Sequence, residues 1–576
     1  MQHAELRRRF LDFFAARGHA VVKSSPLLPD DPSVLFTTAG MQQFKPYYTG
    51  DADAAKDFGS LNTASVQKCV RTSDIDEVGD ESHLTFFEML GNFSFGDYFK
   101  KDAIAWAHEF ITKELGLEIE YVTVFGGEPS TGSGQGVPED TESAAIWREI
   151  APDVQVRKAG RADNFWGPTG DEGPCGPTTE IYVDGIEIWN VVFNQYYQSK
   201  DGSLGPLKTQ GIDTGMGLER LAKVVQKAET VFETDLFAPM MALLPESIGA
   251  RTRRIVADHA RAVAFMIADG VRPSNKEQGY VLRRLMRRVI VHEHLSSGSF
   301  DASQILDAVV IAYQGDYPEL DATVVREVFV HEKEKFSRTL KHGLKEMAKL
   351  PVIDSAAAFR LYESFGLPYE IIKELGGDSA KDLTRGDFDE RFREHQEKSR
   401  AGAEKKFGGH GLLLDTGELK AADESELKVV TRLHTATHLL HAALRKVLGD
   451  EVQQAGSDIT VERTRFDFSF PRKLTDEEIT GVQDIVNDII GKDLPVNKEV
   501  MPKAEAEKTG ALFFFKEKYP DPVNVYYVGK DLGSAFSKEF CGGPHVTHTG
   551  EIGTVRIIKE EAVGAGTRRI RATVQP

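Results

Sequence analysis

The chain lacks any apolar run near the roughly 20 residues that a membrane-spanning helix needs. It is also poor in cysteine: Cys69, Cys175 and Cys541 are odd in number and far apart. We therefore expect no membrane association and no disulfide framework, and this cysteine usage fits the cytoplasm. The first 18 residues lack a cleavage-like segment, so we expect a first helix rather than a leader.

Positive charge is scarce as well. The 576 residues hold 70 Lys and Arg against 89 Asp and Glu, a net charge of -19. A diffuse acidic field repels phosphates, so any contact with a nucleic acid must be local. Residues 251–290 form one basic island, with ten Lys or Arg against three acids.

The chain is too long for one core, and we expect three or four domains. Residues 1–245 mix short β-like runs with helical stretches, which indicates an α/β domain. Helical periodicity dominates 246–400, a Gly-, Lys- and acid-rich linker is expected over 401–427, and a second mixed α+β domain over 428–576.

The basic island contains an amphipathic helical pattern. One face carries five apolar residues: Val281, Leu282, Leu285, Met286 and Val289. The other face carries four arginines: Arg283, Arg284, Arg287 and Arg288. The pattern predicts a helix with its apolar stripe on the core and its arginines outside.

Three segments offer groups that ATP-dependent activation of a carboxylic acid needs. That chemistry requires a cation for the α-phosphate, a platform for adenine, and an anion for a substrate ammonium group. Cys69–Arg71, His83–Phe99 and Gly211–Arg220 supply arginines, phenylalanines and carboxylates in short motifs.

The motifs TFFEMLGNFSFGDYF and DTGMGLER resemble motifs 2 and 3 of class II aminoacyl-tRNA synthetases, and of the alanyl enzymes in particular. The resemblance implies an antiparallel sheet flanked by helices, with ATP and Mg²⁺ as cofactors. It also implies that Arg71 binds the α-phosphate, Phe86 or Phe87 stacks on adenine, Glu88 accepts from the adenine amino group, and Arg220 holds the other side of the nucleotide.

Further matching segments wall an alanine pocket in that family. The resemblance makes Trp166, Asn190 and Asp213 the substrate contacts, with Asp213 pairing the ammonium group. The catalytic set is then Arg71, Glu88, Asp213 and Arg220. Taken one at a time, such residues are more often core or structural ion pairs.

A second constellation lies near the C-terminal end. His434 and His438 stand at i and i+4, on one face of a helix, and Cys541 and His545 follow on a glycine-rich turn. Three imidazoles and a thiolate suit tetrahedral Zn²⁺. A metalloprotease helix would need Glu after its first His, where this chain has Thr435.

The pairing of HTATH with CGGPH resembles the editing domain shared by alanyl-tRNA synthetases and free-standing alanyl-tRNA deacylases. The resemblance implies a zinc-dependent α+β domain that hydrolyses Ser-tRNA(Ala) and Gly-tRNA(Ala), with Gln454 at the editing site. The segment Gly564–Arg569 matches as well. The family usually has Thr where this chain has Pro544, which affects the shape of the metal turn.

The resemblance also implies that the helical domain recognises a G·U pair in the acceptor stem of tRNA(Ala). Asn275 would read a base edge while Arg283, Arg284, Arg287 and Arg288 meet phosphates. An arginine face that is only solvated is an equally good interpretation of those four.

The family's small β-barrel before the HxxxH segment and its C-terminal region have no counterpart in this sequence, so we expect a monomer. Two alternatives stay open beside the two-site alanine ligase. One is a tRNA-binding or regulatory protein that kept the fold without ligation; the other is a deacylase that acts only on mischarged tRNA. ATP–pyrophosphate exchange with alanine separates the ligase from both alternatives, and a deacylase would still hydrolyse mischarged tRNA.

Overall fold

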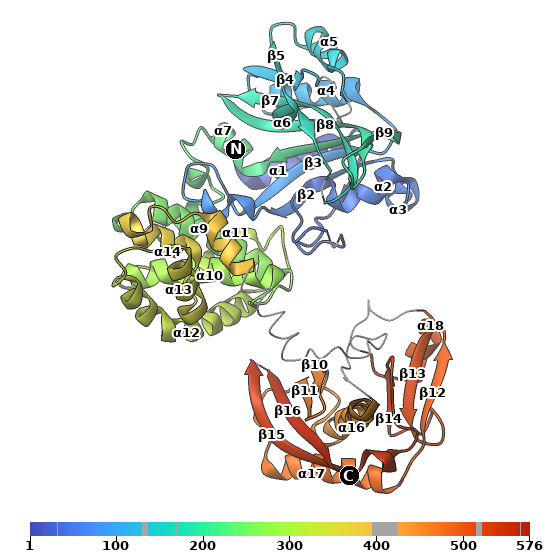
Figure 1. Ribbon diagram of the computed structural model, residues 1–576. Helices are drawn as coiled ribbons and strands as arrows, with labels where there is room; N and C mark the ends of the chain where they lie inside the picture. Colours follow the sequence, from blue (N-terminus) through green and yellow to red (C-terminus); the bar gives the residue numbers. More distant parts are fainter. Residues whose placement is uncertain are drawn as a thin grey trace. The chain divides into compact units, whose positions relative to one another are not determined.

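The computed structural model (Figure 1) describes residues 1–31, 33–128, 136–168, 170–393, 424–513, 521–564 and 566–575. The chain forms two units, Met1–Arg391 and Phe392–Pro576. Among the described helices, none is both long and apolar enough to cross a membrane.

A mixed, mainly antiparallel sheet forms the frame of the first unit. Its order is β1-β2-β3-β9-β8-β7-β4-β5, with β6 paired to β7; among the strands that the structure describes in this sheet, only the β1/β2 and β4/β5 pairs are parallel. The strands are β1 (Ala20–Val22), β2 (Asn62–Val70), β3 (Phe86–Ser94), β4 (Tyr121–Phe125), β5 (Gln155–Ala159), β6 (Phe165–Trp166), β7 (Gly173–Val183), β8 (Ile186–Gln198) and β9 (Leu204–Gly217). This confirms the expected antiparallel sheet flanked by helices.

Short helices flank this sheet. They are α1 (His3–Ala15), α2 (Lys45–Thr49), α3 (Ala54–Phe58), α4 (Lys100–Glu109), α5 (Thr141–Ile150), α6 (Arg161–Asn164), α7 (Leu218–Gln226) and α8 (Ala238–Met241). The expected first helix is α1, whose phenylalanines recur at helical spacing. Phe10 and Phe14 are fully buried and contact Trp189 of β8, which attaches α1 to the sheet.

The rest of the first unit is helical. It contains α9 (Ala250–Ala268), α10 (Glu277–Leu295), α11 (Ala302–Tyr313), α12 (Ala322–Met347), α13 (Ser355–Phe365) and α14 (Tyr369–Gly376). Asp301, Asp321 and Asp354 accept backbone N–H groups at the starts of α11, α12 and α13, which stabilises these ends. Phe265 of α9 stacks on Phe86 of β3 at 4.1 Å, so sheet and helices share one core. The domain boundary at 245 and 246 stays a prediction.

The second unit contains two antiparallel sheets, β10-β11-β16-β15 and β12-β13-β14. Its helix α16 (Glu424–Leu448) packs against strands of both sheets, and α17 (Asp476–Gly491) packs against α16 and β15. The other elements are β10 (Gln454–Ile459), β11 (Thr464–Ser469), β12 (Val496–Met501), α18 (Lys503–Ala506), β13 (Val523–Val528), β14 (Ser537–Phe540), β15 (Thr554–Gly564) and β16 (Thr567–Gln575). Of the linker expected over 401–427, residues 401–423 lie outside the described residues, and 424–427 belong to α16.

Candidate functional site

A cavity of about 410 Å³ opens on the sheet of the first unit, within the size range of ligand pockets. We call it the sheet cavity. Six of the eight residues that the sequence singled out for binding ATP and alanine line it: Arg71, Phe87, Trp166, Asn190, Asp213 and Arg220. They come from segments far apart in the chain, so the fold brings them together.

Strand register sets the amino-acid side of the sheet cavity. Asn190 of β8 lies opposite Gly215 of β9, and Asp213 of β9 lies opposite Val192. Because side chains alternate along a strand, Asn190 and Asp213 share one face. Asp213 is 5% exposed, and burial raises the pKa of its carboxyl to about 7. A cationic group beside it would favour the charged carboxylate.

Two buried polar atoms on this side have no hydrogen-bond partner among the described residues. They are Nε1 of Trp166, a donor, and Oδ1 of Asn190, an acceptor. Buried polar groups are nearly always paired in folded proteins. Here a donor, an acceptor and a carboxylate line one cavity, which suits a small zwitterion.

The other side of the sheet cavity carries two guanidinium groups and an aromatic ring. Arg71 follows β2, and its guanidinium carbon lies 4.9 Å from the centre of the Phe87 ring. Arg220, in the first turn of α7, is half exposed and donates to Glu187 at 2.6 Å. The arrangement offers cations for phosphates and a ring face for a base.

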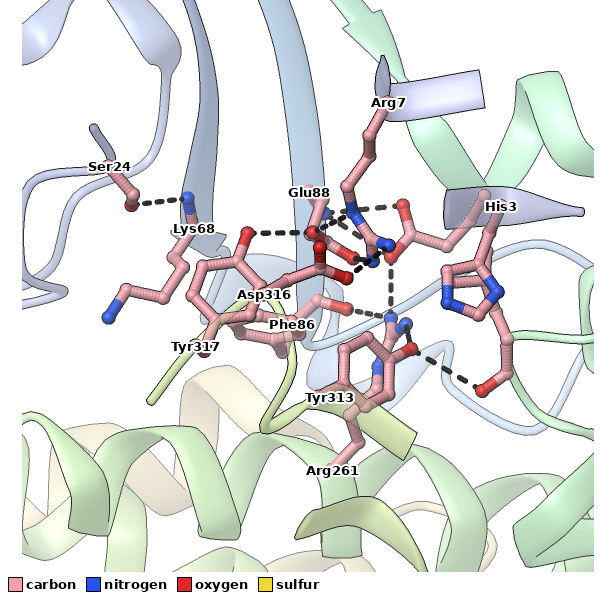
Figure 2. Close-up of polar contacts among 12 residues, drawn as sticks. His3, Arg7, Ser24, Lys68, Phe86, Glu88, Arg261, Tyr313, Asp316 and Tyr317 are labelled. Atoms are coloured by element: carbon pink, nitrogen blue, oxygen red, sulfur yellow. Dashed lines mark hydrogen bonds and ion pairs between the residues drawn. The ribbon is translucent and has the colours of Figure 1, made fainter. Parts of the chain in front are cut away.

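Two expected nucleotide contacts, Phe86 and Glu88, do not line the sheet cavity. The Glu88 carboxylate accepts from Arg7 at 2.8 and 2.5 Å and from the Tyr317 hydroxyl at 2.7 Å (Figure 2). Phe86 is fully buried against Phe265. The reason is the two-residue period of a strand: Phe87 and Met89 of β3 line the cavity, whereas Phe86, Glu88 and Leu90 point to the opposite face and are buried.

Five carboxylates that the sequence did not single out also line the sheet cavity, and two of them are buried, Glu180 and Glu219. Glu219, of the GLER sequence, accepts from Arg261 at 2.9 Å, and burial raises its pKa to about 7. Burial, with the nearby Glu187, raises the pKa of Glu180 to about 7. The motif context was a usable signal for Glu219, whereas Glu180 stands in an ordinary strand pattern.

The four arginines expected to face phosphates are mostly buried, which corrects that expectation. The exposed fractions of the side chains of Arg283, Arg284, Arg287 and Arg288 are 14, 12, 15 and 2%. The apolar face of α10 is buried as expected, but α12 and α14 also cover the arginine face.

Each of these arginines has protein partners. Arg283 and Arg287 pair with Glu332 of α12 at 3.3 and 2.8 Å. Arg284 pairs with Asp76 and Glu370, and Arg288 donates to the carbonyl of Ile75 at 3.0 Å. Their charge is used inside the protein and is not displayed to a nucleic acid. Asn275 is exposed and accepts from Arg283, so it stays available as a base contact.

In the second unit, His434, His438, Cys541 and His545 meet, as the sequence predicts; we call them the histidine–cysteine cluster. Their ligand atoms all lie within 4.8 Å of one another. The Cys541 sulfur is 3.3 Å from Nε2 of His434 and 3.4 Å from Nε2 of His545. A tetrahedral zinc with bonds of about 2.0 to 2.3 Å needs ligand atoms roughly 3.3 to 3.7 Å apart. The donor set and these spacings fit zinc.

Two hydrogen bonds orient the imidazoles. Nδ1 of His434 lies 3.0 Å from the carbonyl oxygen of Pro544, and Nδ1 of His545 lies 3.1 Å from the hydroxyl of Thr435. A proton on each Nδ1 leaves both Nε2 atoms toward Cys541, as in metal sites with an outer shell of hydrogen bonds. Burial and the neighbouring His438 lower the pKa of His434 to about 3, so its imidazole is neutral. Proline at position 544, where the family usually has Thr, therefore still supplies the backbone carbonyl that orients His434.

Gln454 begins β10, and its side chain donates to the Ser457 hydroxyl at 3.0 Å. Arg569, in the segment that closes the family match, pairs with Asp467 at 2.6 Å. The editing role of Gln454 stays a prediction.

The model of the family "tRNA synthetases class II (A)" matches residues 5–466, and that of the "Threonyl and Alanyl tRNA synthetase second additional domain" matches residues 523–571. Alanine–tRNA ligase of Borrelia hermsii is 42% identical over 99% of this chain and 99% of its own length. The chain belongs to the alanine–tRNA ligase family. Two further members of that family are the Treponema pallidum protein, 42% identical over 99% of this chain and 98% of its own, and the Rubrobacter xylanophilus protein, 37% identical over 99% and 78%.

Alanine–tRNA ligases thus include proteins that this chain matches almost end to end and proteins that are longer. Among solved structures, the aspartyl-tRNA synthetase of Entamoeba histolytica aligns with a TM-score of 0.26 and 12% identity, over 41% of this chain and 56% of its own. That similarity is too weak to establish a shared fold.

Proposed function

We propose that this chain is an alanine–tRNA ligase with a second, editing site. It would activate alanine with ATP to alanyl-adenylate and pass the alanyl group to the 3′ end of tRNA(Ala). The observation that carries the proposal is the sheet cavity, which gathers Arg71, Phe87 and Arg220 on one side and Trp166, Asn190 and Asp213 on the other. Family membership supports the same reading.

In the proposed reaction, Asp213 pairs with the ammonium group of alanine. Trp166 and Asn190 form hydrogen bonds with the remaining polar atoms of alanine. The alanine carboxylate attacks the α-phosphorus of ATP and pyrophosphate leaves, while Arg71 and Arg220 offset the phosphate charge. The substrate is its own nucleophile. Cys175 fits no such role because burial raises the pKa of its thiol to about 11.

Mg²⁺ would accompany ATP, because it prefers phosphate and carboxylate oxygens. Glu180 and Glu187 line the sheet cavity and offer such oxygens. When bound, the ion neutralises phosphate charge. In the second step the terminal ribose hydroxyl of the tRNA attacks the adenylate carbonyl carbon and AMP leaves. Positioning and charge are again the contribution of the protein.

The second site would hydrolyse Ser-tRNA(Ala) and Gly-tRNA(Ala). One methyl group separates glycine from alanine, worth roughly 1 to 3 kcal/mol, and a small pocket rejects the serine hydroxyl weakly. His434, His438, Cys541 and His545 would hold Zn²⁺, which polarises water or orients the ester end of the tRNA. Gln454 is the proposed polar contact beside it.

For tRNA, we propose that Asn275 reads the G·U pair of the acceptor stem, because it is exposed on the loop before α10. We also propose a monomer, since residues of one chain line the sheet cavity and build the histidine–cysteine cluster. The cytoplasm is the proposed compartment, where cysteines stay reduced.

ATP–pyrophosphate exchange tests the proposal. We expect exchange that depends on alanine, with serine and glycine as weaker substrates. No exchange would leave the two alternatives. Hydrolysis of Ser-tRNA(Ala) without exchange would indicate a deacylase, and neither activity would indicate a tRNA-binding protein.

A further inference from the structure

The segment that carries Arg71 connects β2 to a short 3-10 turn. Residues 71–76 lead from the end of β2 into the 3-10 turn Ser73–Asp76, and Arg71 and Asp74 line the sheet cavity. The Arg71 backbone N–H donates to the carbonyl of Thr85 at 3.0 Å, which fixes the near end of the segment. The position of the phosphate-facing guanidinium therefore also depends on how the far end is held.

Guanidinium groups from the helical part hold that far end. The Asp76 carboxylate accepts from Arg284 at 2.7 Å and from Arg385 at 3.0 and 2.8 Å. One residue earlier, the carbonyl of Ile75, a fully buried residue, accepts from Arg288 at 3.0 Å. Two consecutive residues are thus fixed by three arginines distant in sequence.

A second carboxylate fixes the arginines in turn. Glu370 of α14 is 5% exposed and contacts both Arg284 and Arg385. Burial acts to raise the pKa of Glu370, but the charges of Arg284, Arg385 and Arg288 outweigh burial and hold it well below its ordinary value. Glu370 is therefore ionised at neutral pH, and the guanidinium of Arg385 also lies 4.2 Å from the centre of the Tyr369 ring.

We name Asp76, Arg284, Arg288, Arg385 and Glu370 the Asp76 clamp. It acts on one wall of the sheet cavity, the one formed by the segment after β2. The amino-acid side is placed separately, because Trp166, Asn190 and Asp213 belong to β6, β8 and β9. Loosening the clamp should therefore affect the two substrates unequally.

We propose that Asp76 is a positioning residue for nucleotide binding, which acts through Arg284 and Arg385 to hold the segment that carries Arg71 and Asp74. The inference rests on the proposed function, because it takes ATP as the ligand on this side. It gives the arginines of α10 a different task from phosphate contact: they preorganise the wall that meets the phosphates.

The test compares Asp76→Asn, which keeps shape but removes charge, with a matched control, Asp307→Asn. Asp307 of α11 pairs with Arg326, an exposed residue of the same unit. In alanine-dependent exchange, Asp76→Asn should raise the KM for ATP about tenfold or more and leave the KM for alanine within about twofold. Asp307→Asn should leave both unchanged, and Asp76→Glu should recover part of the ATP affinity.

A parallel rise of both KM values, or an unchanged KM for ATP in a folded variant, would overturn the proposal. If Asp76→Asn does not fold by circular dichroism, Arg385→Gln is measured in its place and the same split is required. A calorimetric titration with ATP adds a further requirement. Because Asp76 affects ATP binding by holding Arg71 in place, Asp76→Asn should weaken ATP binding less than about twofold in an Arg71→Ala background. If Asp76→Asn weakens ATP binding equally with and without Arg71, the proposal is contradicted.

Failure of the proposed function looks different. An unmutated chain that binds ATP but shows no exchange would end the ligase proposal, and the titration would still decide the clamp: weaker binding in Asp76→Asn supports it, equal binding overturns it. No ATP binding by the unmutated chain would overturn both.

Discussion

The sheet cavity and the histidine–cysteine cluster follow opposite plans. In the cavity, polar atoms of Trp166 and Asn190 have no partner among the described residues, and burial raises the pKa of Asp213 to about 7. In the cluster, the side chains contact one another, and burial keeps the pKa of the imidazoles low. The cavity is suited to ligands that bring their own charge and leave. The cluster is suited to an ion that stays.

The largest expected effect separates the two sites. Arg71→Ala should lower alanine-dependent exchange about 100- to 1,000-fold, because it removes a cation from the developing phosphate charge. Hydrolysis of Ser-tRNA(Ala) should stay within about twofold, since the cluster lies in the other unit. Exchange near the unmutated rate would mean that Arg71 is not at the nucleotide.

A substitution in the histidine–cysteine cluster should have the opposite effect: loss of hydrolysis without loss of exchange. The purified chain should carry about one zinc, and Cys541→Ala should lose most of it together with Ser-tRNA(Ala) hydrolysis. Metal analysis by mass spectrometry is the measurement, with Cys175→Ala as the cysteine control because Cys175 is buried in the first unit. An unmutated chain without zinc would remove the editing mechanism.

The effect of pH on alanine binding should be smaller than the effects of these two substitutions, and it tests the role of Asp213. The pKa of Asp213 is raised to about 7, so its carboxyl is largely protonated below that pH and charged above it. Because the charged form pairs with the ammonium group, the KM for alanine should fall as pH rises from 6 to 8, by up to about tenfold per unit below the pKa. Asp213→Asn should flatten that profile. An equally steep profile in the variant would assign the titration to another group.

The smallest expected effect on catalysis tests whether Glu88 of β3 lies outside the nucleotide site. Glu88→Gln breaks a buried pair with Arg7 and should cost about 3 kcal/mol of stability. Since Glu88 faces away from the cavity, the KM for ATP should change less than about threefold. Thermal unfolding and exchange together make the comparison; a large rise in that KM without loss of stability would restore Glu88 to the nucleotide site.

The histidine–cysteine cluster could be predicted because its four residues lie in two short sequence motifs with fixed spacing. His434 and His438 share a helix face by period alone, and Cys541 and His545 come with a tight turn. The motifs likewise marked Arg71 and Asp213. They did not say which face of β3 meets the cavity, although strand alternation separates Phe87 from its neighbours.

The prediction that the arginines of α10 face outward failed for a different reason. A helical wheel shows which face is apolar but not which elements cover the opposite face. The partners here are Asp76, Glu332 and Glu370, which lie far away in sequence and on other elements. Their pairing depends on tertiary packing, and no local pattern at residues 281–289 encodes it.

The central claim is that one chain holds two sites that work independently. The most direct measurement assays alanine-dependent exchange and Ser-tRNA(Ala) hydrolysis side by side in the unmutated chain, Arg71→Ala and Cys541→Ala. We expect both activities in the first, hydrolysis without exchange in the second, and exchange without hydrolysis in the third. Loss of both activities in either folded variant, or a missing activity in the unmutated chain, would contradict the account.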